Sequence, residues 1–305
     1  MSPRPNHTSN PFRQSDVGLS IKTGLAWWDL RRNLLGRGDG PYQAENLPDG
    51  LLRYSKLFDR DDLLDILGLG KQVLPEVTLK IDLKRSITRV KLGDRSFILK
   101  KYHRLHRCML FSPDRKGWLG AHRLNNDVAC HAWYRRHDLS YAVIVYADAG
   151  DLDLYMPQCL ASPPELLNEL FRQVGTMIAQ LHRQNIFHAD TKPGNFVYDG
   201  KTIPAQVKLI DTDDVRTYWR ISKRLKVRNL AQFIGCTRPE FSETYLPALL
   251  AFFQGYLQQY PTSPAELLRL FPALRNATAA LYPKREPLNQ QLFAQLQEHI
   301  SALPQ

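Results

Sequence analysis

The clearest hydrophobic pattern in the chain is helical and lies at residues 165–185. Apolar residues recur there at three- and four-residue spacing: Leu166, Leu167, Leu170, Phe171, Val174, Met177, Ile178 and Leu181. This spacing places them on one side of an α-helix, and the prolines at 163 and 164 suit a helix start. We therefore predict a long helix with one buried stripe. The apolar run at residues 245–257 is too short to span a bilayer and predicts a second core helix.

Shorter patterns predict strands. Residues 86–91 and 96–102 are strand-like and flank the turn Leu92-Gly93-Asp94-Arg95. A further strand is predicted at residues 141–146, followed by a turn at 149–151 and a strand at 152–157. After the long helix, residues 196–210 predict a hairpin that turns near Asp199-Gly200.

Other segments predict shorter helices. They lie at residues 61–68, at 124–133 and in peripheral positions from residue 264 onward. Trp27 and Trp28 stand beside several arginines and predict a basic amphipathic helix. Two interpretations of that helix stay open: it packs on its own domain, or it lies at a membrane interface.

One motif follows the long helix directly. Residues 188–195 have the spacing H-x-D-x-K-P-x-N, formed by His188, Asp190, Lys192, Pro193 and Asn195, and an acidic residue follows at 211. This is the spacing of a kinase catalytic loop followed by a magnesium-binding acid. The predicted hairpin between Asn195 and Asp211 would bring these two side chains close together. Two ligands of one metal ion must lie close together in this way.

The residue types suit phosphoryl transfer from ATP. Such enzymes mainly position groups and neutralise charge. Asp190 is the candidate for the carboxylate that takes the proton of the attacking hydroxyl, and Lys192 can reach the transferring phosphate. Asn195 and Asp211 offer the oxygen ligands that Mg²⁺ prefers. His188 is expected to order the loop rather than to react.

A kinase also needs a lysine that binds the α- and β-phosphates of ATP. Lys100, near the end of the strand at 96–102, is our candidate, and Lys101 would point to the opposite face. The partner of this lysine is usually an acid on the next helix. Asp127, in the helix predicted at 124–133, is the best-placed acid, although a solvated surface position would suit it equally.

Several of these segments together resemble the bacterial lipopolysaccharide core kinases, the Kdo/WaaP group. The resemblance is carried by Phe97-Ile98-Leu99-Lys100-Lys101, Arg115-Lys116-Gly117-Trp118, Asn126-Asp127, His188-x-Asp190 and Arg228-Asn229-Leu230-Ala231-Gln232-Phe233. It covers roughly residues 78–257 and implies a protein-kinase-like fold. It also implies ATP-dependent phosphorylation of an inner-core sugar hydroxyl, on heptose or Kdo, at the cytoplasmic face of the inner membrane.

The resemblance implies a fold class and a division of the chain. The fold is α+β and two-lobed, with a small antiparallel-sheet N-lobe and a helical C-lobe. Residues 1–75 are expected to be an N-terminal extension, partly disordered and then helical. Residues 76–160 are expected to form the N-lobe, and residues 161–305 the C-lobe.

The chain departs from the usual kinase pattern in two places. Some members of the group carry His where this chain has Asn195, and Lys192-Pro193-x-Asn195 is closer to general protein kinases. No G-x-G-x-x-G occurs between residues 77 and 90, where Lys80, Lys84 and Arg85 stand instead. Basic side chains could replace the amides of a glycine turn. The other interpretation is a pseudokinase that binds ATP poorly.

The acids after Asp211 also allow more than one interpretation. Asp213 and Asp214 give three carboxylates in four residues, which repel one another unless basic groups or a cation lie nearby. Asp213 could support the metal site, or it could be an acid paired with arginine. Arg216 is near enough in sequence to be that partner.

Composition narrows the partners. Lys+Arg 41 against Asp+Glu 30 gives a net charge of +11, which favours a nucleotide, a phosphorylated sugar or an anionic lipid surface. No nucleic-acid-binding motif is found, so nucleic acid is not expected. The four cysteines show no C-x-x-C pair and suit a reducing compartment, and the N-terminus lacks an apolar signal segment. The expected location is the cytoplasm, with peripheral membrane contact.

Two other functions compete with a sugar kinase. A protein Ser/Thr kinase is favoured by Lys192-Pro193-x-Asn195, but no Ala-Pro-Glu segment follows Asp211. Arg238-Pro239-Glu240 is the nearest similar segment. The second competitor is a non-catalytic scaffold that kept the fold. The sequence names neither the acceptor position nor the oligomeric state.

Overall fold

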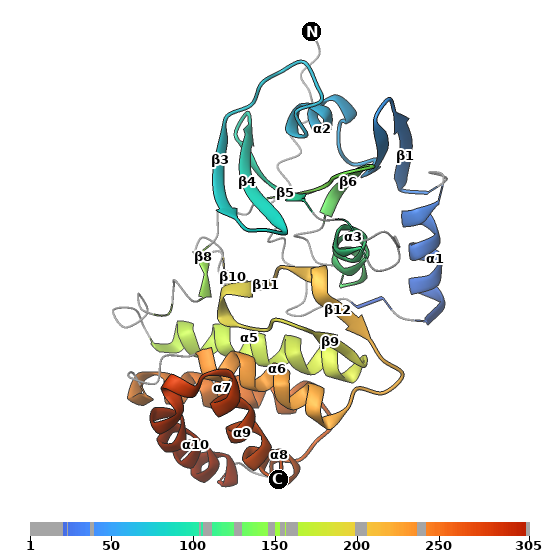
Figure 1. Cartoon of the computed structure of the whole chain (residues 1–305). Coiled ribbons are helices and arrows are strands. Elements are labelled where there is room, and N and C mark those ends of the chain that lie inside the picture. The colour runs from blue at the N-terminus through green and yellow to red at the C-terminus, as the bar shows by residue number, and fades with distance from the viewer. Residues whose placement is uncertain are drawn as a thin grey trace.

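The computed structural model describes residues 21–22, 24–36, 40–103, 105, 112–124, 130–145, 150–152, 156, 164–198, 206–236 and 242–302. These residues combine helices with antiparallel sheet, as the predicted α+β class requires. The large sheet and the α-helices up to residue 123 lie in the upper part of Figure 1, and the α-helices from residue 164 onward lie in the lower part.

The upper part is built on a seven-stranded sheet with the order β1-β2-β6-β7-β5-β4-β3. Every neighbouring pair in it is antiparallel. Its strands are β1 (Tyr42–Leu47), β2 (Gly50–Ser55), β3 (Glu76–Ile81), β4 (Arg85–Leu92), β5 (Arg95–Tyr102), β6 (Cys130–Arg136) and β7 (Ser140–Val145). Strands β1 and β2 thus come from the segment that the sequence analysis assigned to an N-terminal extension.

The predicted hairpin at 86–102 is confirmed. Strands β4 and β5 pair from Arg85 opposite Tyr102 to Leu92 opposite Arg95. Gly93 in the turn has φ +58°, a conformation that side chains disfavour. Strand β7 confirms the strand expected at 141–146 as far as Val145.

The helix predicted at residues 124–133 is wrong where it is described, and residues 125–129 lie outside the described part of the chain. Helix α3 (Pro113–Arg123) ends before it, and Cys130–Arg136 is strand β6. The reason is burial on both faces of the sheet: Ala132 and Tyr134 belong to one core cluster, whereas Trp133 belongs to another. A strand covered on both faces shows no alternation of apolar and polar residues, so periodicity alone does not distinguish it from a helix.

The segment expected to link the sheet to the helices also differs from the prediction. Residues 150–151, predicted as a turn, form the short strand β8 (Gly150–Asp151), which pairs with β10 (Phe196–Tyr198). The strand predicted from residue 152 is wrong where it is described. The Met156 N–H donates to the Leu152 carbonyl at 2.9 Å, which is a helical contact. Residues 153–155 lie outside the described part of the chain.

Both faces of the large sheet are covered. Leu63 and Ile66 of α2 (Arg60–Ile66) pack against one face. Leu34 of α1 (Gly24–Leu35) and Trp118 of α3 pack against the other, where Tyr102 also lies. The predicted short helices near 27–37 and 61–68 are therefore confirmed. Helix α1 packs on its own domain through Leu34, while Trp28 stays 61% exposed.

The lower part is a helical assembly around the predicted long helix, now α5 (Pro164–Arg183). The other helices are α6 (Lys223–Cys236), α7 (Ser242–Gln259), α8 (Pro264–Leu268), α9 (Phe271–Leu281) and α10 (Glu286–Ser301). Helices α5 and α7 lie in close contact, because a Cβ added at Gly175 would be pressed against the Phe252 carbonyl oxygen. The core helix predicted at 245–257 and the helices after residue 264 are confirmed.

Two small sheets lie between the large sheet and the helices (Figure 1). Strand β9 (Ile186–His188) pairs with β12 (Val215–Thr217), and β10 pairs with β11 (Val207–Leu209) as well as with β8. The arms of the hairpin predicted at 196–210 are thus confirmed, and its turn at 199–205 lies outside the described residues. These strands carry the motif residues at the junction of the two parts.

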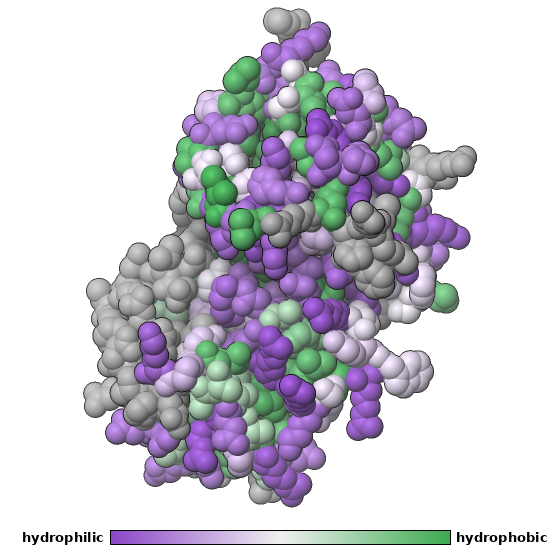
Figure 2. Space-filling model, viewed as in Figure 1, coloured by the Kyte–Doolittle hydropathy of each residue, from purple (hydrophilic) through white to green (hydrophobic). Residues whose placement is uncertain are grey.

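The face of the molecule shown in Figure 2 is mainly polar. On the face in Figure 2, hydrophilic residues predominate and hydrophobic ones form small separate groups. Among the helices that the structure describes, none combines the length and the apolar character needed to cross a lipid bilayer.

Candidate functional site

The H-x-D-x-K-P-x-N loop lies between β9 and β10. His188 at its start is fully buried, and its Nδ1 accepts the Asp190 N–H at 3.2 Å. Burial lowers the pKa of His188, so the ring is neutral near pH 7. This geometry suits the predicted role of His188 in ordering the loop.

Two buried side-chain amides of helix α6 form hydrogen bonds with the backbone of the loop. Asn229 Nδ2 donates to the His188 carbonyl, and Gln232 Nε2 donates to the Ala189 carbonyl at 2.7 Å. Thr191 Oγ1 donates to the Asn229 carbonyl at 2.8 Å. Sequence reasoning used this helix only for its resemblance and missed these contacts. Two amides three residues apart on an apolar helix face were the available signal, because they share that face.

The loop presents Asp190 and Lys192 as a pair. Lys192 Nζ lies 2.8 Å from Asp190 Oδ2, and both side chains are partly exposed, at 49% and 41%. Asn195 lies in the short 3₁₀ turn Pro193–Asn195 and is buried. Its Nδ2 donates to the Asp190 carbonyl at 2.7 Å, so the amide fixes the backbone of the proposed base. The side-chain oxygen of Asn195 is the atom of this amide that suits a metal ion.

The hairpin brings the second half of the motif beside the first. The Ile210 N–H donates to the Asn195 carbonyl at 2.8 Å, so Asp211 follows immediately after a backbone contact with Asn195. Asp211 has φ +58°, an uncommon conformation for a residue with a side chain. This conformation stands where the chain leaves β11 for the short turn Thr212–Asp214.

Lys100 reaches this segment from the large sheet. It is 6% exposed, and its Nζ lies 2.8 Å from Asp211 Oδ1 and 3.5 Å from Asp213 Oδ1. Lys101 lies on the opposite face, over the Tyr141 ring, as predicted. The candidate partner Asp127 lies outside the described residues, so its pairing stays a prediction. Within the described residues, the acids that contact Lys100 come from the 211–214 segment.

Arg85 from β4 contacts the same two acids. Its guanidinium donates to Asp211 at 3.1 and 3.3 Å and to Asp213 Oδ2 at 3.0 Å. Tyr102 donates its hydroxyl to Asp213 Oδ2 at 2.9 Å. Asp213 is therefore an arginine-paired acid, with Arg85 as the partner instead of Arg216. We call Arg85, Lys100, Asp211 and Asp213 the charge cluster.

Two glycines of α3 make room for the charge cluster. A Cβ at Gly117 would lie 2.6 Å from Asp213 Oδ1, and a Cβ at Gly120 would lie 2.4 Å from the Thr212 carbonyl oxygen. Side chains at these positions would collide with the segment. Helix α3 therefore contacts the 211–214 segment, whose acids bind Lys100, through two residues that have no side chain.

Contacts within the charge cluster shift the pKa values of Asp211, Lys100 and Arg85. Burial alone would raise the pKa of Asp211, but the charges of Lys100 and Arg85 hold it well below its usual range. Burial opposes the charge of Lys100 and of Arg85, yet the two carboxylates raise both pKa values above their usual ranges. Asp211, Lys100 and Arg85 are therefore held in their charged forms near pH 7.

Asp190 and Asp211 face a common cavity of about 610 Å³. Its lining residues are Asp82, Lys84, Arg85, Tyr102, Leu105, Pro113, Lys116, Asp190, Asp211, Asp213 and Asp214. The cavity therefore lies at the junction of β4, β5, α3 and the motif segments. Its five acids and three basic residues come from segments far apart in the chain, at residues 82–85, 116, 190 and 211–214.

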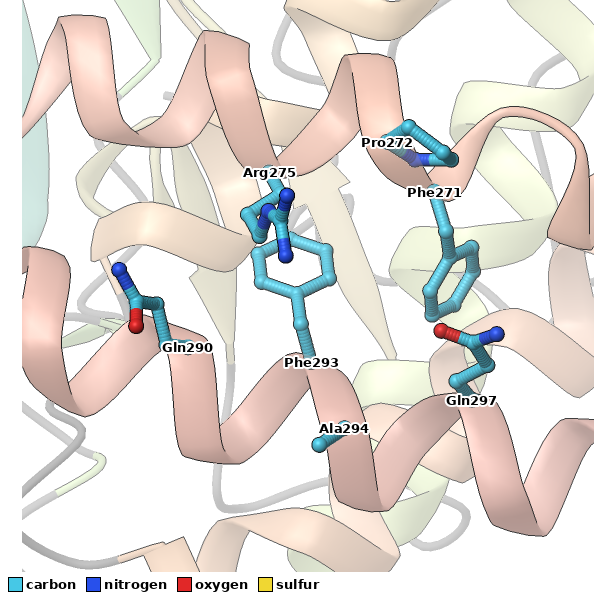
Figure 3. Close-up of a pocket in the computed structure, with 7 residues that line it drawn as sticks. All are labelled: Phe271, Pro272, Arg275, Gln290, Phe293, Ala294 and Gln297. Carbon is cyan, nitrogen blue, oxygen red and sulfur yellow. The ribbon is translucent and has the colours of Figure 1, made fainter.

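A second hollow, between α9 and α10, has a different character. Figure 3 shows Phe271, Phe293, Arg275 and two glutamines around it, and its volume is about 150 Å³. No carboxylate is among its lining residues, so no residue there could act as a general base at neutral pH. The chemistry is assigned to the larger cavity.

The donor set of the large cavity fits a magnesium ion bound together with a nucleotide. Among the described residues, no group of three or more His, Cys, Asp or Glu side chains could hold a metal alone. Mg²⁺ is usually held by one or two carboxylates together with substrate phosphates and water, so a complete protein cage is not required. Asp211 is a carboxylate at neutral pH, and the residue before it, Ile210, donates its N–H to the Asn195 backbone carbonyl.

The sequence comparison agrees with this arrangement. Residues 131–253 match the Lipopolysaccharide kinase (Kdo/WaaP) family. The resemblance found in the sequence is thereby confirmed. The matched stretch contains the whole of the motif from His188 to Asp213 and helix α6, whereas Lys100 and Arg85 precede it.

Proposed function

We propose that the protein is an ATP- and Mg²⁺-dependent kinase that phosphorylates a sugar hydroxyl of the lipopolysaccharide inner core, on heptose or Kdo. The observation that carries this proposal is the shared cavity of Asp190 and Asp211, with Lys100 in contact with Asp211. The family match supports a phosphotransferase with a saccharide acceptor. The seven-stranded sheet in the upper part of Figure 1 and the helices α5 to α10 in the lower part support a two-lobed protein-kinase-like fold.

Asp190 takes the proton of the acceptor hydroxyl in this proposal. Its side chain is partly exposed at the cavity, so an acceptor can approach it, and Asn195 and His188 fix its backbone on both sides. Lys192, 2.8 Å away, neutralises the carboxylate in the free protein. It would contact the transferring γ-phosphate once a nucleotide is bound.

Asn195 and Asp211 would hold Mg²⁺, and Lys100 would contact the α- and β-phosphates. When bound, the metal ion neutralises charge on the phosphate oxygens. The contact between Lys100 and Asp211 places the proposed phosphate-binding lysine next to the proposed metal-binding carboxylate. Both groups are charged at neutral pH, which electrostatic stabilisation of phosphoryl transfer requires.

We place the enzyme in the cytoplasm with peripheral contact to the inner membrane. The acceptor would be anchored in that membrane, and a net charge of +11 favours approach to an anionic surface.

Transfer of labelled γ-phosphate tests the proposal. The purified chain is incubated with Mg²⁺-ATP and either a dephosphorylated core oligosaccharide or a mixture of generic proteins. We expect label in the oligosaccharide and loss of transfer by about 10²-fold or more in Asp190→Asn, because general-base catalysis contributes about that much. Asp138→Asn is the matched control, since Asp138 pairs with Arg136 at 2.9 Å and does not line the cavity.

The same experiment separates the competing functions. Label in the proteins alone would favour a protein Ser/Thr kinase. No transfer to either acceptor, together with no Mg²⁺-dependent binding of ATP, would favour a non-catalytic scaffold.

A further inference from the structure

The turn between β3 and β4 uses its own backbone amides. Asp82 Oδ1 accepts the Lys84 N–H at 2.8 Å and the Arg85 N–H at 2.9 Å. In a glycine-rich nucleotide loop such N–H groups point at the phosphates. Here an aspartate side chain occupies them, and no glycine stands between residues 71 and 92. The turn therefore offers side chains, not amides, to a ligand in the cavity.

Arg85 of this turn lines the cavity and contacts the acids of the 211–214 segment. It is the first residue of β4 and lies opposite Tyr102, two residues beyond Lys100 on the same face of β5. Its side chain is 22% exposed and spans the cavity to Asp211 and Asp213. The guanidinium thus lies within contact of the carboxylate that is proposed to bind the metal.

The charge cluster is balanced in the free protein. Arg85 and Lys100 supply two positive charges, and Asp211 and Asp213 supply two negative ones. A cation bound by Asp211 would take over part of the role of Arg85 there, leaving the guanidinium free for another anion. The planar guanidinium binds phosphate through two parallel hydrogen bonds, which an ammonium does not.

We propose that Arg85 binds the phosphates of the nucleotide, in place of the backbone amides of a glycine-rich turn. This inference rests on the proposed function, because it supplies the phosphate contact that an ATP site without such a turn needs. Arg85 exchanges Asp211 for the phosphate oxygens when the nucleotide enters. The ion pairs seen here hold it in position for that exchange.

Calorimetric titration of the purified chain with ATP, ADP and adenosine tests the inference, each with and without Mg²⁺. In Arg85→Gln we expect ATP and ADP to bind about 10-fold more weakly or worse, since hydrogen bonds to charged groups contribute at least that much. Adenosine, which has no phosphate, should bind as it does to the unmodified protein. Arg85→Lys keeps the charge but loses the paired hydrogen bonds. Its affinity for ATP should therefore lie between that of the unmodified protein and that of Arg85→Gln.

Arg95→Gln is the matched control. Arg95 lies on β5 and pairs with Asp62 at 3.0 Å, away from the cavity, so its removal should leave the affinity for ATP unchanged. Thermal unfolding checks that each variant is folded, and Arg85→Lys replaces Arg85→Gln as the deciding variant if the latter does not fold.

Three outcomes would overturn the inference. If the Arg85 variants bind ATP as tightly as the unmodified protein does, the arginine does not contact the phosphates. Tighter binding would show that Arg85 is instead a latch that competes with the nucleotide. Failure of the unmodified protein to bind ATP would reject the proposed function as well, whereas the first two results leave that function standing.

Discussion

A methyl group at Gly120 should disturb the site without touching any charged residue. The Cβ of Gly120→Ala would lie 2.4 Å from the Thr212 carbonyl oxygen and 3.3 Å from the Thr212 Cβ. An ordinary contact begins at 3.4 Å, so the first distance must grow by about 1 Å. Because the carbonyl belongs to the backbone, it cannot rotate away, and either α3 or the 211–214 segment has to shift.

The magnitudes follow from this geometry. Replacing glycine by alanine inside a helix gains about 1 kcal/mol, whereas overpacking costs about 1–3 kcal/mol, so the free energy of unfolding should fall by about 0–2 kcal/mol. The effect on phosphoryl transfer should be larger. Asp211 directly precedes Thr212, and a misplacement of about 1 Å in an active site can cost about 10²-fold in rate.

Urea unfolding and steady-state transfer kinetics measure the two effects. Gly117→Ala is the comparison variant, because its Cβ would meet the movable carboxylate of Asp213 at 2.6 Å rather than backbone. We expect it to change the affinity for nucleotide through Lys100 with less effect on unfolding. A G120A variant with unchanged kcat would refute the reasoning, since α3 would then not position the metal-binding segment.

Two further perturbations test the support of the site. Asn229→Ala leaves the His188 carbonyl and His182 Nε2 without their partner, so unfolding free energy should fall by about 1–3 kcal/mol and kcat should fall with it; unchanged urea unfolding would contradict the role of α6. Burial lowers the pKa of His182 to about 3 and those of His122 and His131 to about 4. Below about pH 6.5 the unfolded chain therefore binds more protons than the folded one, and stability should decline as pH falls, by about 2 kcal/mol per histidine near pH 5. Urea unfolding at pH 7.5 and pH 5 measures this decline, and equal stability at both would show that these rings are not held neutral.

Local patterns predicted much of the fold. The long helix α5, the β4–β5 hairpin and the arms of the 196–210 hairpin follow from periodicity and turn residues within one short window. Strand β6 could not be found in this way, because residues such as Ala132 and Trp133 are buried on opposite faces of the sheet. Its neighbours in the sheet, β2 and β7, decide its conformation rather than its own pattern.

The candidate site shows the same division. Spacing placed Asp190, Lys192, Asn195 and Asp211 in one motif, and the strand pattern indicated the inward direction of Lys100. The pairing of Asp213 with Arg85 spans 128 residues, so no local rule could reveal it. The absence of side chains at the α3 glycines has meaning only once the helix is placed against the 211–214 segment.

Shared contacts in the charge cluster have a consequence for how this protein tolerates change. Arg85 and Lys100 each touch both acids, so no charge depends on a single neighbour. Neutralising one member leaves one uncompensated charge among the three remaining charged groups, whereas neutralising one base and one acid together restores the balance. Related sequences that lose an acid here should therefore lose a base as well, and such paired replacement would be visible as covariation between positions more than a hundred residues apart.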